Sequence, residues 1–198
     1  YESESILIPA ASADEPKRAE FSAELADRYL TDGALAWTRE QQCVTCHTNG
    51  SYLAVRGALT DKLGPPPTEL RTFFVEQARK LEGSDKVRSG ATGMVTTYIA
   101  LGLAEWDAHV TKTRSPETDQ ALRVMLSAQL EDGSWGFGPG SSADGGKTWT
   151  LAKTKPDPSP TALALLAFEA AGFGPDDPTV SRGVAALLAM QHPSGLWK

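Results

Sequence analysis

The sequence has only two cysteines among its 198 residues, which excludes the disulfide-stapled class of small secreted domains. No apolar run approaches the length of a membrane-spanning helix. Basic residues are also in the minority, 19 against 25 acidic ones. The resulting net charge of −6 argues against nucleic acid or an anionic membrane surface as a partner. Alternating apolar and polar runs joined by hairpin turns are missing, which argues against an all-β fold.

The chain opens without a recognisable signal peptide. Residues 1–16 carry several acids and lack the basic segment with which such peptides begin. We expect residues 1–17 to form a flexible N-terminal segment, and residues 18–198 to form one helical domain that is either incomplete or a piece of a longer one.

Both cysteines fall in the stretch Cys43-Val44-Thr45-Cys46-His47. Two thiols three residues apart with a histidine directly after the second are typical of c-type haem attachment. In such a site the thiols form thioethers with the porphyrin, and the histidine binds the iron. The motif therefore predicts one haem c, covalently bound through Cys43 and Cys46 and ligated by His47.

Three other uses of this motif fit less well. A redox Cys-x-x-Cys pair is typical of a βαβ context, which the helical pattern does not provide. A zinc site needs further ligands, and the remaining histidines, His109 and His192, lie far away in the sequence. A disulfide across two residues would close a small, strained loop. Because haem attachment takes place outside the cytoplasm, we expect a periplasmic or otherwise exported protein whose signal peptide is not in this chain.

Apolar residues recur at helical spacing along almost the whole sequence. The expected helices span residues 18–29, 33–42, 51–60, 68–82, 90–107, 116–130, 159–171 and 178–191. Proline near the start of several of them, and glycine after the end of others, supports these limits.

A repeated pattern follows two of the helices. Gln129 to Trp135 and Gln191 to Trp197 share the form Gln-x-x-x-Gly-x-Trp, and each copy follows a helix rich in alanine and leucine. A third copy runs from Gln42 to Tyr52, if Cys43–Cys46 is read as a four-residue insertion.

This pattern resembles the QW repeat of squalene-hopene cyclases and of other prenyltransferase-like α/α-toroid proteins. The stretch around residues 34–53 also resembles bacterial toroid-like proteins that carry a haem motif in the first repeat. The resemblance implies an all-α fold, an incomplete α/α toroid of alternating inner and outer helices bearing a covalent c-type haem. It places residues 51–60, 90–107 and 159–171 in the inner layer, and residues 33–42, 68–82, 116–130 and 178–191 in the outer layer.

The motifs that would carry the family's chemistry are missing from the sequence. Cyclases use an Asp-x-Asp-Asp proton donor, whereas Asp176-Asp177 is better explained as a helix N-cap. Prenyltransferases bind zinc through Asp, Cys and His, but here the cysteines are assigned to haem. The sequence thus leans against an enzyme.

Other residues are candidates for the surroundings of the haem. Met94 is the preferred sixth ligand, with an open or water-bound position and His192 as alternatives. Arg39, Arg56 and Arg88 are candidates for binding the haem propionates, although each also fits a surface position. Tyr52 is a candidate for packing on the porphyrin face, and repeat packing explains it equally well.

Three functions remain open on these grounds. The favoured one is a c-type cytochrome that passes single electrons to an unidentified redox partner protein. The first alternative is a five-coordinate haem that binds or transforms a gas or peroxide. The second is a binding module for an apolar, terpenoid-like small molecule in which haem is structural, and this alternative rests on fold analogy alone.

Overall fold

The computed structural model describes residues 2–3, 6–7, 12–17, 19–84, 93–137 and 154–197. Its longer helices are α1 (Ala23–Gln41), α2 (Asn49–Arg56), α4 (Thr68–Leu81), α6 (Gly93–Trp106), α7 (Pro116–Leu126), α8 (Pro158–Ala170) and α9 (Pro178–Ala189). Short elements are the 3₁₀ turn η1 (Gly57–Leu59), the single turn α3 (Thr60–Leu63) and the π-helical turn η2 (Asp107–Thr111). Among the described residues, no helix is both long and apolar enough to cross a membrane.

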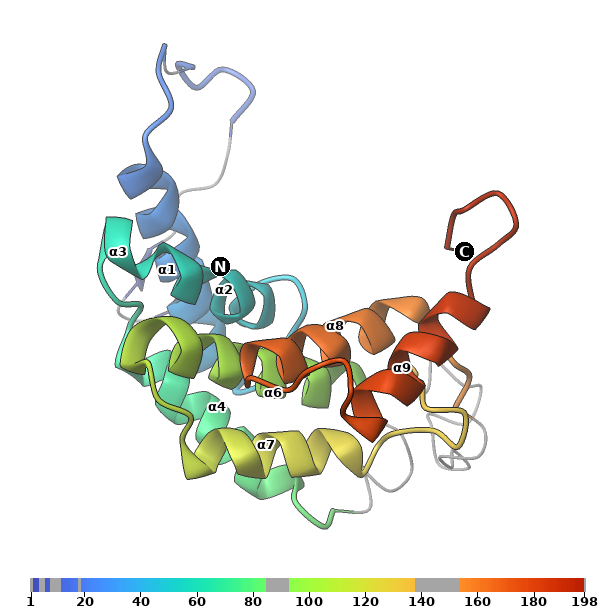
Figure 1. Ribbon diagram of the computed structural model, residues 1–198. Helices are drawn as coiled ribbons and strands as arrows, with labels where there is room; N and C mark the ends of the chain where they lie inside the picture. The colour runs from blue at the N-terminus through green and yellow to red at the C-terminus, as the bar shows by residue number, and fades with distance from the viewer. Residues whose placement is uncertain are drawn as a thin grey trace, which may run out of the picture.

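The helices form two layers, as Figure 1 shows. Helix α6 lies between α2 and α8 in one layer, and α4 and α7 pack together beneath it in a second layer. Helix α1 contacts both α2 and α4, and α9 contacts α8. The predicted inner and outer helices are therefore confirmed for this core, and the all-α toroid-type architecture with them.

Helix α6 is the centre of the hydrophobic core. Its residues from Ile99 to Ala104 are all buried, because helices cover it on every side. Two glycines bring α2 close to it: a Cβ on Gly50 would lie 3.1 Å from Cγ of Tyr98, and one on Gly102 would lie 3.0 Å from Cδ2 of Leu53. The α2–α6 contact thus depends on small residues at two crossing points.

Two copies of the Gln-x-x-x-Gly-x-Trp pattern have the same structure, which confirms the repeat. Nε2 of Gln129 donates to the Gly133 carbonyl at 2.9 Å, and Nε1 of Trp135 donates to the Met125 carbonyl at 2.9 Å. The second copy repeats both bonds, from Gln191 to Gly195 at 2.7 Å and from Trp197 to Leu187 at 3.2 Å. Gly133 and Gly195 both adopt a positive φ, which favours glycine.

The predicted third copy of the repeat, from Gln42 to Tyr52, is wrong, because it lacks the hydrogen bonds of the other two copies. Gln42 donates back to the Thr38 and Arg39 carbonyls at the end of α1, and Gly50 lies inside α2. The Tyr52 hydroxyl bonds to Oγ1 of Thr31 at 2.7 Å, whereas the tryptophans bond to a carbonyl ten residues back. The cysteine-bearing insertion has therefore replaced the repeat turn with a turn of its own.

Two other expectations need correction. Residues 18–29 and 33–42 form one continuous helix, α1, which begins at the Ser22 N-cap and passes through Gly33. Residues 116–130 are helical only to Leu126. Helix α8 is buried on one face and leaves Leu166 exposed on another.

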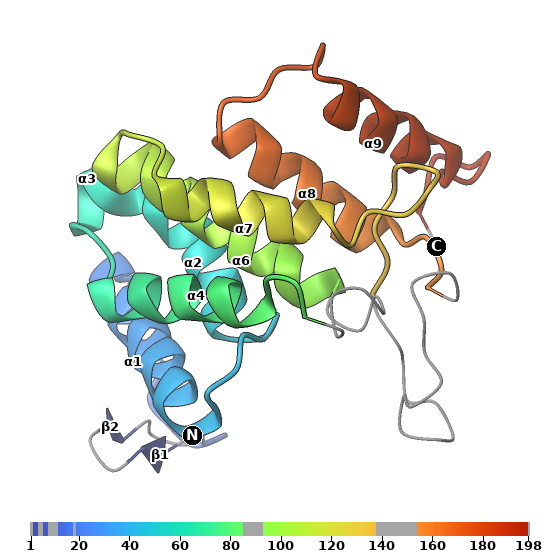
Figure 2. The ribbon, with the colours of Figure 1, turned by 90° about the horizontal axis from the view of Figure 1, so that it is seen from below.

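The segment 1–17 contains a two-residue antiparallel pair, β1 (Glu2–Ser3) and β2 (Ile6–Leu7), although hairpin strands were not expected. Figure 2 shows both strands beside α1, which they contact. At the other end of the chain, Asp177 accepts hydrogen bonds from the backbone N–H groups of Thr179 and Val180. Its role as the N-cap of α9 is confirmed.

Candidate functional site

The turn between α1 and α2, residues 42–48, carries both cysteines and His47. Helix α1 stops at Gln41 because Gln42 adopts a left-handed conformation with φ of 50°. The Gln42 side-chain amide donates to the Thr38 carbonyl at 2.9 Å and to the Arg39 carbonyl at 3.0 Å. These bonds satisfy carbonyls that the end of a helix leaves open.

Asn49, the first residue of α2, fixes the shape of this turn. Its side chain is fully buried, and Nδ2 donates to Oγ1 of Thr38 and to the Cys43 carbonyl, each at 3.0 Å. Its Oδ1 accepts from the backbone N–H of Thr45 at 3.0 Å. Nε1 of Trp37 adds a second bond to the Cys43 carbonyl, at 3.1 Å. The backbone between the cysteines is therefore anchored from both helices.

The two thiols are free and differ in their surroundings. Cys43 is exposed, whereas Cys46 is half-buried and lies near Tyr98 of α6. Burial raises the pKa of the Tyr98 hydroxyl, and the nearby Cys46 raises it further. Within the described ranges, no group of three or more His, Cys, Asp or Glu side chains converges as a metal ion would require.

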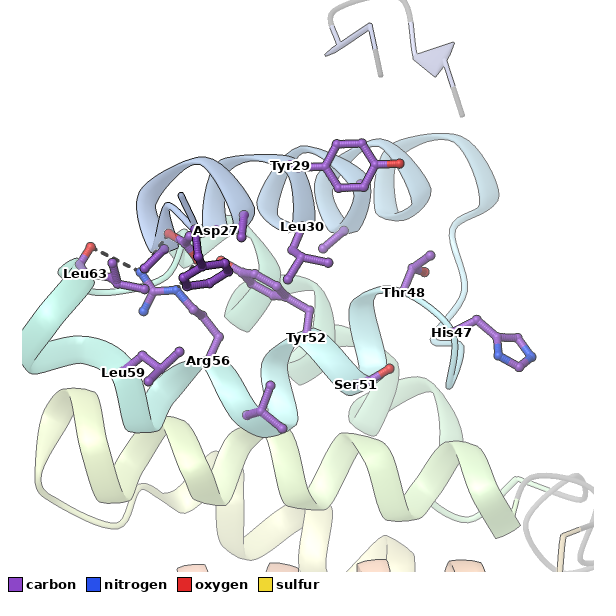
Figure 3. Close-up of a pocket in the computed structure, with 16 residues that line it drawn as sticks. Asp27, Tyr29, Leu30, His47, Thr48, Ser51, Tyr52, Arg56, Leu59 and Leu63 are labelled. Carbon is purple, nitrogen blue, oxygen red and sulfur yellow. Dashed lines mark hydrogen bonds and ion pairs between the residues drawn. The ribbon is translucent and has the colours of Figure 1, made fainter. Parts of the chain in front are cut away.

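A cavity of about 520 Å³ opens beside this turn, between α1 and the segment from α2 to α3 (Figure 3). Its walls are largely apolar and include Phe21, Leu30, Ala34, Val55, Leu59 and Leu63. His47, Thr48 and Ser51 lie at one end. Figure 3 shows the His47 ring directed away from the cavity.

The other end of the cavity holds a polar cluster whose members bind one another. The buried Arg56 guanidinium forms an ion pair with Asp27 of α1 and also donates to the Leu63 and Gly64 carbonyls. Tyr52 lies next to this pair, bonded to Thr31. Burial is the main reason why the pKa of Tyr52 is raised. The cluster joins α1, α2 and α3.

The structure brings some of the predicted site residues together and separates others. Cys43, Cys46 and His47 share the turn, and Tyr52 and Arg56 line the cavity. Arg39 lies apart, with Nε and one terminal nitrogen each 2.7 Å from a carboxylate oxygen of Glu69. Arg88 lies outside the described residues.

Met94, the preferred sixth ligand, is half-buried in the first turn of α6. The alternative, His192, lies in the turn after α9, where its Nδ1 is 2.8 Å from Oγ of Ser194. None of these positions tests the ligand assignments, which stay predictions.

Sequence reasoning missed three features of this region: the cavity, the Asp27–Arg56 pair and the role of Asn49. Asp27 and Arg56 are 29 residues apart, so no local pattern links them. For Asn49, a signal existed. A single asparagine directly before Gly50, at the start of an expected helix, is the type of residue that bonds to nearby backbone groups.

Comparison with known proteins gives a family match over residues 42–198, to the squalene-hopene cyclase C-terminal domain. The squalene–hopene cyclase of Bradyrhizobium diazoefficiens is 42% identical over 82 residues, which are 41% of this chain and 12% of that protein. The lanosterol synthase of Pneumocystis carinii is 33% identical over 79 residues, 40% of this chain and 11% of that protein. The match thus spans about an eighth or less of either relative's length. No solved structure matches the chain.

These matches overturn the favoured prediction of an electron-transfer cytochrome. The family and both relatives are cyclases or synthases by name, and none of the names refers to a cytochrome. The haem cofactor itself is not addressed by the matches and stays a prediction.

The resemblance to squalene-hopene cyclases, which was drawn from the repeats, is therefore confirmed, apart from the haem. The family model matches most of the chain, including both copies of the glutamine–tryptophan turn. This chain belongs to the squalene-hopene cyclase C-terminal domain family.

Proposed function

We propose that this domain binds an apolar molecule of the triterpene class in the cavity between α1 and α2. The names of its two relatives refer to squalene, hopene and lanosterol, all of them large and almost entirely hydrocarbon. The proposal concerns binding. It does not extend to cyclisation, because the sequence lacks the Asp-x-Asp-Asp motif and Asp177 serves as the N-cap of α9.

The observation that carries the proposal is a cluster of exposed apolar side chains around the cavity. Phe21, Leu30 and Val55 line it while remaining 86%, 57% and 63% exposed. Tyr29 and Leu59 are further exposed members of the same lining. A ligand that covers these side chains gains about 25 cal/mol for each Å² of apolar surface removed from water. An exposed apolar patch of this kind is typical of a binding site.

The Asp27–Arg56 pair and Tyr52 are compatible with the same type of ligand. Arg56 and Asp27 bind each other, and Tyr52 binds Thr31, so these side chains need no partner from a ligand. A hydrocarbon can therefore enter without leaving a buried charge unpaired. The cavity volume of about 520 Å³ is within the usual range for small-molecule sites.

Equilibrium dialysis with radiolabelled squalene, delivered from cyclodextrin, tests the proposal. The variant Leu30→Asp places a charge in the cavity wall and is expected to weaken binding at least about tenfold. Leu188→Asp is the matched control, because Leu188 lies on α9 outside the cavity lining and is 60% exposed against 57% for Leu30. Equal binding by the two variants would overturn the assignment of the cavity.

A further inference from the structure

We propose that the turn between α1 and α2 carries one covalently attached c-type haem, bound through Cys43 and Cys46 and ligated by His47, outside the α1–α2 cavity. This inference is independent of the proposed triterpene binding. It carries with it a periplasmic or otherwise exported location, because such attachment takes place outside the cytoplasm.

The motif has the required spacing, and the structure leaves its groups accessible. Cys43 and His47 are exposed and Cys46 is half-buried, with both thiols free. The segment between the thiols is not helical, and its backbone bonds run to Asn49 and Trp37. Val44 is buried in the hydrophobic core and anchors the turn, whereas neither thiol is tied up in a disulfide.

The site lies on the side of the turn that faces α6. Cys46 is near Tyr98, and Met94 comes one helical turn before Tyr98 on the same face of α6. His47 stands at one end of the cavity lining, and its ring is directed away from the cavity in Figure 3. A haem on this turn thus has an aromatic ring and a thioether at the start of α6 as neighbours, and the cavity stays open for its own ligand.

The attachment is an addition reaction with no leaving group. Each thiol adds across one vinyl group of ferrous protoporphyrin IX. The sulfur bonds to the vinyl carbon next to the ring, and the thiol proton ends on the terminal carbon, which becomes a methyl group. No electrons are gained or lost overall, so the product has the mass of the protein plus one haem.

The experiment uses the full chain, exported in a bacterial host that contains a c-type haem maturation system. We expect denatured protein to keep its haem, to give a pyridine haemochrome of the c type, and to show the mass of one added haem. A chain without covalent haem, made alongside a known c-type cytochrome that is loaded, would overturn the proposal.

Variants separate the roles of the motif residues. Cys43→Ala and Cys46→Ala are each expected to leave at most one thioether, seen as a shifted haemochrome band, and the double variant is expected to bind no covalent haem. The control His192→Ala, at another exposed imidazole, should load as the parent does. Full covalent loading of the double variant would contradict the assignment.

A last measurement tests where the haem sits. Haem-loaded protein is expected to bind radiolabelled squalene as tightly as haem-free protein. If loading abolishes squalene binding while Leu30→Asp weakens it in the haem-free chain, the haem occupies the cavity and its placement beside α6 is wrong. If squalene binds neither form, the triterpene proposal fails and the haem assignment still stands on its own mass and spectrum.

Discussion

Asn49 and Thr38 are eleven residues apart and joined by a buried hydrogen bond of 3.0 Å, from Nδ2 of the amide to Oγ1 of the hydroxyl. The bond links the first residue of α2 to the last buried residue of α1. The same amide holds the Cys43 carbonyl and the Thr45 N–H. One side chain therefore sets both the position of α2 and the shape of the cysteine-bearing turn.

Replacing this amide should destabilise the domain. Asn49→Ala removes three hydrogen bonds and leaves buried groups without partners, which we expect to lower the free energy of unfolding by about 3 kcal/mol. Gln120→Ala removes an amide that bonds to Glu82 at the exposed surface, and should change it by less than about 0.5 kcal/mol. Urea denaturation measures both, and similar values for the two variants would contradict the role given to Asn49.

The two repeat tryptophans offer a comparison within one motif. Trp135 is fully buried and bonds to the Met125 carbonyl, whereas Trp197 is 46% exposed and bonds to the Leu187 carbonyl. Trp135→Phe leaves the buried Met125 carbonyl without its indole donor, and should lower the free energy of unfolding by about 2 kcal/mol. Trp197→Phe should cost less than about 0.5 kcal/mol, because water can take the place of the indole. Thermal unfolding measures both variants. An equal loss of stability in the two would contradict the claim that burial decides how much each tryptophan contributes.

A buried carboxylate anchors the end of α6. Oδ2 of Asp107 accepts from the Ser115 N–H at 2.6 Å, from the Ser115 hydroxyl at 2.7 Å and from the Thr118 hydroxyl at 2.6 Å. Asp107→Ala should lower the free energy of unfolding by about 3 kcal/mol, since three donors lose a charged acceptor. The control is Asp119→Ala at an exposed ion pair with Arg114, expected to change it by less than about 1 kcal/mol. An unchanged denaturation midpoint for Asp107→Ala would refute the anchoring role.

The contributions of Glu105 and Glu69 to stability should change with pH in opposite directions. Burial raises the pKa of Glu105, so the native state holds more protons than the unfolded state and Glu105 loses stabilising effect as the pH rises above 4.5. Hydrogen bonds from Arg39 lower the pKa of Glu69, so its contribution is lost as the pH falls below 4.5.

Denaturation curves between pH 3 and pH 7 compare Glu105→Gln and Glu69→Gln with the parent. Relative to the parent, Glu105→Gln should gain stability as the pH rises, and Glu69→Gln should lose it. Parallel pH profiles for both variants would contradict these pKa directions.

Local patterns predicted most helices because their signals are short-range. Ser115-Pro116 and Asp177-Pro178 begin α7 and α9 where cap and proline preferences place them. The predicted gap between residues 29 and 33 is wrong, because an isolated glycine such as Gly33 is tolerated inside a helix. In the structure Gly33 lies within α1 and lines the cavity, where the missing side chain leaves space.

The candidate site was predictable only where its chemistry lies in one stretch of sequence. The Cys43–His47 motif is such a stretch. The cavity is not, because its apolar wall combines Leu30 of α1 with Val55 of α2, and helical spacing alone assigns both to ordinary packing. Their position around one cavity, on which the proposed binding site rests, arises only when the chain folds.

Photo-crosslinking with a diazirine-bearing squalene analogue, followed by peptide mapping, tests the central claim most directly. Adducts are expected on α1 and α2, around Leu30 and Val55, and excess unlabelled squalene should suppress them. Suppressible adducts confined to α8 and α9, or none on any helix, would contradict it.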